Sequence, residues 1–84
     1  LVALQEAEAV RLPFPPDFSL PAELGRARAR LTIVCNPNSP SGTLTPTEEL
    51  GRLAREVEGL LVVDEAYADF ADDNALRLLR ECDN

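Results

Sequence analysis

The sequence contains no lysine, no histidine, no methionine and no tryptophan, and its aromatic residues are one tyrosine and three phenylalanines. All eight basic residues are therefore arginine, and 15 acidic residues bring the formal net charge to −7. This acidic balance argues against nucleic acid or an anionic membrane surface as a partner. The absence of lysine also excludes, within these residues, a phosphate-binding loop of the GxxxxGK[ST] type.

Cysteine is scarce, and long hydrophobic runs are missing. Cys35 and Cys82 have neither the CxxC or Cys/His spacing of a zinc site nor the pattern of a disulfide framework. We therefore predict no metal site and two free thiols in a reducing compartment, the cytoplasm. No apolar run reaches the roughly 20 residues that cross a bilayer, and no charged-then-apolar signal sequence opens the chain. We predict no membrane partner.

The length of 84 residues suits one small domain or a part of a larger one. A chain of this size buries only about 60% of its unfolded surface, so its stability is expected to be marginal. The first residue is not methionine, and residues 1–9 open inside a helical pattern. We therefore expect the chain to be cut from something longer.

A strand–helix–strand unit occupies the middle of the chain. Residues 31–35 and 60–63 are short apolar runs rich in β-branched residues, which predict strands buried on both faces. Between them, residues 46–58 carry an apolar stripe at helical spacing. The stripe consists of Leu50, Leu53, Ala54 and Val57. We predict an α/β fold of the three-layer type, with about three parallel strands and a right-handed βαβ crossover.

The predicted helix has clear start and stop signals. Thr45 is expected to cap it, with Pro46 at its first position and Glu48 completing a capping box. Gly59 is expected to end it in a left-handed conformation. Shorter elements are predicted elsewhere: the end of a helix over residues 1–9, a strand over 9–12, and helices over 22–29 and 75–81. In the last of these, Leu76, Leu79 and Cys82 are expected to face the core.

Polar residues follow both predicted strands. Residues 36–42 read Asn-Pro-Asn-Ser-Pro-Ser-Gly, a rigid loop with several side-chain donors, and Asp64 and Glu65 follow residues 60–63 directly. Since ligands bind at the carboxyl ends of parallel strands, the loop and Asp64 are expected to share one site. An acid there faces a positive charge, either a metal ion or a protonated ring nitrogen. The first option matches the magnesium-binding strand of an ATPase, although the lysine loop of that class is absent.

Residues 36–42, followed by a capped helix and then by Val-Val-Asp-Glu-Ala-Tyr at 62–67, resemble the fold-type I aminotransferases (class I/II) that use pyridoxal phosphate. The likeness is closest to their histidinol-phosphate branch. It extends to residues 10–14, 17–20 and 68–70, nearly the whole chain. The resemblance implies transfer of an amino group between histidinol phosphate and 2-oxoglutarate in histidine biosynthesis. Related branches act on aromatic amino acids or threonine phosphate.

The resemblance also implies roles for single residues. Asp64 would hold a proton on the pyridine nitrogen of pyridoxal phosphate, and the Tyr67 hydroxyl would bond the phenolic oxygen of its ring. The family places an asparagine immediately before Pro-Thr-Gly, where it bonds the same oxygen; here that position is Ser39, so either Ser39 or Asn38 would supply the contact. Glu65 is expected to be an outer acid and not a cofactor ligand.

The family's Schiff-base lysine has no counterpart in this chain, so the resemblance implies no catalytic residue here. We predict that residues 1–84 are part of the cofactor-binding large domain, inactive alone, and that their uncovered edges favour self-association or a homodimer. A non-catalytic α/β binding module that kept the loop and the Asp-Tyr pair, or the ATPase fragment considered above, remain the alternatives.

Overall fold

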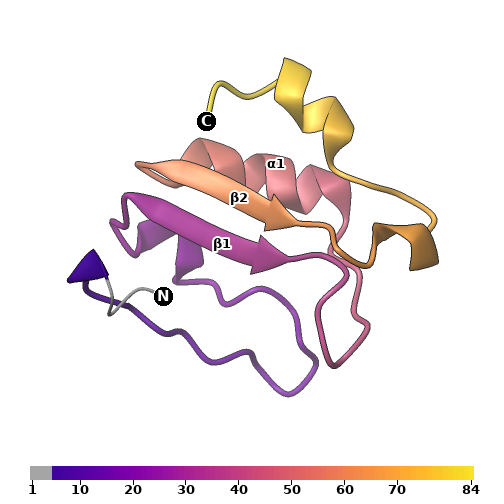
Figure 1. Cartoon of the computed structure of the whole chain (residues 1–84), viewed down its shortest axis with the longest axis horizontal. Helices are drawn as coiled ribbons and strands as arrows, with labels where there is room; N and C mark the ends of the chain where they lie inside the picture. The colour runs from indigo at the N-terminus through magenta and orange to yellow at the C-terminus, as the bar shows by residue number, and fades with distance from the viewer. Residues whose placement is uncertain (1–4) are drawn as a thin grey trace.

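The computed structural model describes residues 5–84. Its elements follow in the order η2 (Leu24–Arg26), β1 (Leu31–Cys35), α1 (Thr47–Glu56), β2 (Leu60–Asp64), η3 (Ala68–Phe70) and η4 (Leu76–Arg80), where η denotes a 3-10 helix. Strands β1 and β2 pair in parallel, with Leu31 opposite Leu60 and Cys35 opposite Asp64 (Figure 1). The predicted strand–helix–strand unit is thus confirmed.

The sheet has two strands within the described residues, not about three. Part of the helix predicted over residues 1–9 lies outside the described range, and residues 7–15 form neither helix nor strand. The prediction of a strand over residues 9–12 was wrong. Pro13, Pro15 and Pro16 follow at once; each lacks a backbone donor and fixes an extended path, so this segment runs as a connection without a ladder partner.

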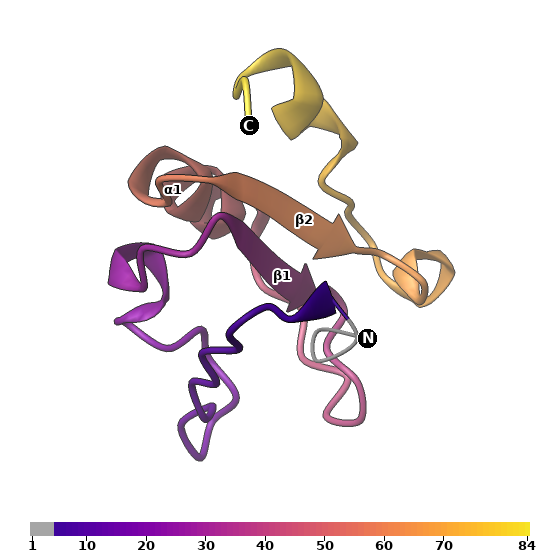
Figure 2. The same cartoon turned by 60° about the vertical axis from the view of Figure 1, so that its left-hand side comes forward.

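The core lies between α1 and one face of the sheet (Figure 2). It consists of Val34, Leu50, Leu53, Ala75 and Leu78. The predicted helical stripe is confirmed for Leu50, which is fully buried, and for Leu53 and Ala54, which are nearly so. Its fourth member, Val57, lies beyond the end of the helix and is half-buried. Strand β1 is buried on one face only, and the same face of β2 is half-buried. On the outer face Ile33 is 59% exposed and Leu60 58%. The prediction of burial on both faces was wrong, because no helix covers this outer face within residues 5–84.

The helix ends differ from the prediction. The N-cap residue is Pro46, with no side-chain cap bond, so the capping box from Thr45 to Glu48 does not form. Thr45 instead bonds a loop asparagine through its backbone. The helix ends at Glu56, and Gly59, two residues beyond its C-cap Val57, is not left-handed. The reason for glycine there is a close approach to the backbone of Ala29 and Arg30.

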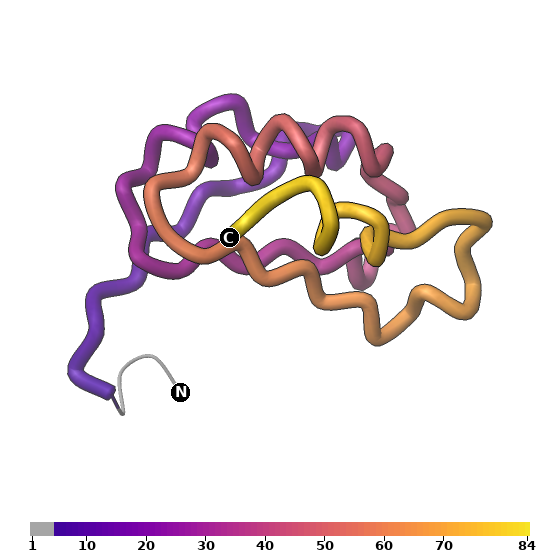
Figure 3. The backbone as a smooth tube through the Cα atoms, turned by 90° about the horizontal axis from the view of Figure 1, so that it is seen from above, coloured from indigo at the N-terminus to yellow at the C-terminus, as the bar shows by residue number. Residues whose placement is uncertain are grey.

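The outer helices are shorter than predicted. Of residues 22–29 only η2 is helical, and of residues 75–81 only 76–80 are, as the 3-10 helix η4. A 3-10 helix has three residues per turn, so positions i and i+3 share a face. Ala75 and Leu78 therefore point into the core, while Leu76 and Leu79 are exposed, contrary to expectation. After η4 the chain returns to the start of β2 (Figure 3), where the Leu61 amide donates to the Asn84 carbonyl.

Candidate functional site

Both strands point to the same side of the molecule, where the loop after β1 and the turn after β2 lie together (Figure 1). The amide of Asn36 extends the pairing by donating to the Asp64 carbonyl at 2.8 Å. The carboxyl edge therefore brings the asparagine-serine loop next to Asp64, as the sequence predicts. This placement follows from the parallel register alone, because residues that end paired strands must end at the same edge.

Asp64 is exposed at this edge, and its carboxylate accepts two hydrogen bonds. The amide of Ala66 donates to Oδ1 at 3.0 Å, and the thiol of Cys35 donates to Oδ2 at 3.8 Å. Loss of hydration raises the pKa of the Cys35 thiol, and the neighbouring carboxylate raises it further. Cys35 is therefore a neutral donor at neutral pH.

Tyr67 lies on the turn that follows Asp64. The Ala68 amide donates to the Glu65 carbonyl at 3.0 Å, and the Phe70 amide donates to the Tyr67 carbonyl at 3.0 Å. These bonds fold the chain back, so that the Tyr67 ring, 51% exposed, lies with its centroid 6.4 Å from that of Phe70. The backbone at Tyr67 is thus fixed by a short, hydrogen-bonded turn.

A surface hollow of about 510 Å³ joins this turn to the loop after β1. Its lining residues are Pro37, Asn38, Ser39, Pro40, Gly42, Tyr67 and Phe70. Three of the four predicted site residues therefore meet in one hollow. Asp64 is not among its lining residues and lies beside it at the end of β2. Phe70 was not singled out from the sequence, where an isolated phenylalanine after an acidic residue gives no distinctive signal.

The loop keeps its shape through its own hydrogen bonds. The Asn38 amide donates to the Thr43 carbonyl at 2.9 Å, and the Gly42 amide donates to the Asn38 carbonyl at 2.7 Å. Gly42 has φ of 72°, which glycine adopts at no steric cost. The side-chain amide of Asn38 donates to Ser41 Oγ at 2.6 Å. Ser39 is exposed beside it at the rim of the hollow.

Asn36 is the polar residue that sequence reasoning missed. It is 2% exposed, and its side chain exchanges two hydrogen bonds with the backbone of Thr45. The only signal in the sequence was its position between a buried strand and a proline, which does not distinguish a buried amide from an exposed one.

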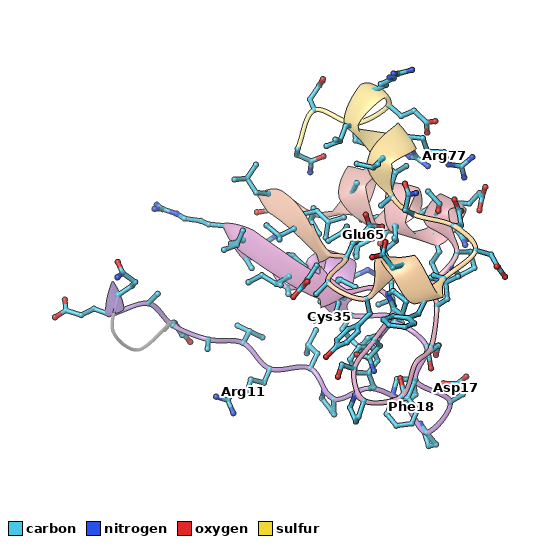
Figure 4. All side chains as sticks on the ribbon, turned by 45° about the vertical axis from the view of Figure 1, so that its right-hand side comes forward. Arg11, Asp17, Phe18, Cys35, Glu65 and Arg77 are labelled. Carbon is cyan, nitrogen blue, oxygen red and sulfur yellow. The ribbon has the colours of Figure 1, made fainter. Side chains whose placement is uncertain are left out.

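Glu65 connects the site to the C-terminal segment. Its Oε1 accepts a hydrogen bond from the Ala75 amide at 2.6 Å, at the start of η4. Figure 4 labels Cys35, the last residue of β1, and Glu65, the first residue after β2. Within residues 5–84, no group of three or more potential metal ligands comes together. None of the helices in this range is both long enough and apolar enough to cross a membrane.

Comparison with known proteins gives one consistent result. The family model for aminotransferase class I and II matches residues 14–84. A protein of Trichormus variabilis named histidinol-phosphate aminotransferase 1 is 44% identical over all of this chain. Histidinol-phosphate aminotransferase 3 of Mesorhizobium japonicum is 42% identical, again over all of it. The chain spans 24% of the length of each of these relatives. A histidinol-phosphate aminotransferase of Syntrophotalea carbinolica is 49% identical over 70% of this chain and 17% of its own length. The chain belongs to the aminotransferase class I and II family.

Proposed function

We propose that this chain is part of a longer, pyridoxal-phosphate-dependent enzyme that transfers an amino group between histidinol phosphate and 2-oxoglutarate in histidine biosynthesis. The observation that carries the proposal is the 44% identity, over the whole chain, to a protein of that name. The carboxyl edge supports it, because an acid, a phenol and a loop with amide and hydroxyl donors lie there together.

The surroundings of Asp64 suit a carboxylate that holds a cationic partner. Its two hydrogen-bond donors, the Cys35 thiol and the Ala66 amide, are both uncharged. A carboxylate offers about four acceptor positions, so lone pairs remain for a further donor. The exposed edge of the sheet leaves room for one. Asp64 would therefore accept a hydrogen bond from the pyridine nitrogen and keep a proton on it.

Pyridoxal phosphate, when bound, supplies a protonated ring that takes up the electrons of a carbanion. The chain's own donors would orient that ring. Tyr67, on its hydrogen-bonded turn, lines the hollow together with Ser39 and Asn38 from the loop. Each would donate to the phenolic oxygen. The Asn38 amide already donates one of its two hydrogens to Ser41, so its second hydrogen and the Ser39 hydroxyl are the two candidate donors from the loop.

The chain alone is expected to be inactive, because its sequence contains no lysine to hold the cofactor covalently. We propose that residues 1–84 belong to the cofactor-binding large domain of a cytoplasmic enzyme. The uncovered outer face of the sheet, with Leu31 and Ile33 at least half exposed, favours self-association. A homodimer of the longer protein is the corresponding expectation.

The test uses the full-length protein that contains this chain, loaded with pyridoxal phosphate. Histidinol phosphate, an aromatic amino acid and threonine phosphate are offered in turn as amino donors, with 2-oxoglutarate as acceptor, and glutamate is measured. We expect histidinol phosphate to give the highest kcat/KM. Highest activity with another donor overturns the substrate, and no transfer from any donor favours a non-catalytic binding module.

Asp64→Asn tests the proposed site within the same enzyme. Removal of a preorganised charge partner lowers kcat by about 10²–10³-fold in comparable sites, and we expect a loss of at least that size. Asp69→Asn is the matched control, because it removes an exposed carboxylate five positions further on, in η3, outside the hollow. Equal activity of the two variants contradicts the role of Asp64.

A further inference from the structure

Asn36 lies where three segments of the site meet. It is the first residue after β1, and its amide donates to the carbonyl of Asp64 at the end of β2. Its side chain reaches the far end of the loop: Nδ2 donates to the Thr45 carbonyl at 3.1 Å, and Oδ1 accepts from the Thr45 amide at 2.7 Å. One residue thus joins the end of β1, the end of β2 and the residues that lead into α1.

These bonds close the base of the loop, which spans residues 36–45. A second pair of bonds, from the Asn38 amide to Thr43 and from the Gly42 amide to Asn38, closes its tip. The base bonds are buried, with Asn36 2% and Thr45 8% exposed, whereas the residues of the tip are partly or fully exposed. Buried bonds open less readily than exposed ones, so the base fixes the path on which the tip depends.

The Asn36 side chain is suited to this place because it presents one donor and one acceptor to the two backbone groups of a single residue. An alanine would leave both the amide and the carbonyl of Thr45 without these partners in a buried position. The free-energy cost of the lost bonds falls on the loop that carries Asn38 and Ser39. The apolar core between helix and sheet is not affected, because Asn36 is not part of it.

We propose that Asn36 is a positioning residue for the cofactor site: its side chain holds the loop on which Ser39 and Asn38 line the hollow with Tyr67, and its backbone amide ties the same loop to Asp64. The effect of Asn36 on cofactor binding rests on the proposed function. Its effect on the conformation of the loop is independent of the proposed function. Asn36 itself lies at the base of the loop, outside the lining of the hollow.

The test compares Asn36→Ala with Asn84→Ala in the full-length protein. Asn84 is the matched control, because its side chain also makes two hydrogen bonds to backbone groups, the carbonyls of Ala54 and Gly59, at the other end of β2. Amide hydrogen exchange of the cofactor-free protein is read at Thr45, Asn38 and Gly42. The dissociation constant of pyridoxal phosphate is read from its absorbance.

In Asn36→Ala we expect the rate of amide hydrogen exchange in the loop and the dissociation constant of pyridoxal phosphate each to rise by about tenfold or more. This factor corresponds to the loss of one buried hydrogen bond. Asn84→Ala should change both by less than about twofold. Unchanged exchange at Asn38 and Gly42 in Asn36→Ala, or an equal loss of cofactor affinity in the control, overturns the positioning role.

The outcomes separate this inference from the proposed function. A wild-type protein that does not bind pyridoxal phosphate contradicts the proposed function, and hydrogen exchange then still decides whether Asn36 holds the loop. If Asn36→Ala does not fold, Asn36→Ser enters the same comparison, since its side chain is shorter and lacks the separate donor and acceptor atoms with which Asn36 bonds the two Thr45 groups. The same criteria apply to it.

Discussion

Replacing Gly59 by alanine tests the close backbone approach between Gly59, just before β2, and residues 29–30, just before β1. A Cβ added at this position would lie 2.7 Å from the carbonyl oxygen of Ala29 and closer still to the carbonyl of Arg30. Both neighbours are backbone atoms, which cannot rotate away as a long side chain can. The Arg30 carbonyl also accepts the Leu60 amide at 3.0 Å, the bond that opens the parallel ladder.

The magnitude follows from these contacts. Inserting a methyl group into a filled space costs about 1–3 kcal/mol. Moving Arg30 away breaks or lengthens one backbone hydrogen bond, worth about 1 kcal/mol. We therefore expect Gly59→Ala to lower the free energy of unfolding by about 2–4 kcal/mol. Urea unfolding followed by far-UV circular dichroism measures it.

Gly42→Ala is the control, because it isolates conformational strain from close approach. Gly42 has φ of 72°, but a Cβ there meets nothing within 4 Å. Its replacement should cost only the strain of a left-handed residue, about 1–2 kcal/mol. If Gly59→Ala destabilises the protein no more than Gly42→Ala does, the close approach of Gly59 to the backbone of Ala29 and Arg30 is contradicted.

Three further substitutions test the packing and the ties around α1. Leu50 is fully buried, so Leu50→Ala should lower the free energy of unfolding by about 2–5 kcal/mol in the same urea experiment, and a loss below about 1 kcal/mol contradicts the packing of α1 on the sheet. The Glu48 carboxylate accepts a hydrogen bond from Arg77, which holds the pKa of Glu48 below its usual 4.5. The stabilisation from this pair is therefore present above pH 4.5 and is lost as the pH falls through the lowered pKa. Glu48→Gln should therefore lower the urea midpoint at neutral pH, by less in high salt and not at all at the lowest pH, whereas a difference independent of pH contradicts the pair. Thr47 is buried and donates to Asp73 at 2.6 Å, which lowers the pKa of that carboxyl below 3.8. In Thr47→Val, NMR titration should show the pKa of Asp73 moving back up, and an unmoved value contradicts the bond.

The central unit was predictable because its signals are local. The β-branched runs at 31–35 and 60–63, and the apolar stripe of α1, act through neighbours in the sequence or one helical turn away. The meeting of the loop and Asp64 was predictable as well, because parallel pairing permits no other arrangement of the strand ends. Tyr67 meets the loop for the same reason, since only two residues separate it from the end of β2.

What could not be predicted depends on residues far apart in the sequence. The glycine at position 59 looks like a helix cap, but its reason is the backbone of Ala29 and Arg30, about thirty positions earlier. Thr45 looks like an N-cap, yet Asn36 engages its backbone from nine positions away. Composition also cannot tell which face of a strand is covered, so the exposure of Ile33 was missed.

The placement of Asp64 separates a functional residue from a structural one. Its carboxylate is exposed, and it accepts one bond from the Ala66 amide on Oδ1 and one from the Cys35 thiol on Oδ2. An asparagine would keep the first bond through its own Oδ1 and could donate from Nδ2 to the Cys35 sulfur in place of the second. The fold therefore gives no reason for a negative charge at the end of β2. Asn36 is the opposite case, a buried amide whose two bonds explain its identity completely. An acid that the fold does not need, beside a tyrosine and a hydrogen-bonded loop, is what the proposed function requires, because that function places a positively charged partner at this edge. Asp64→Asn should accordingly leave the urea midpoint nearly unchanged while it lowers activity, a combination that a structural aspartate would not produce.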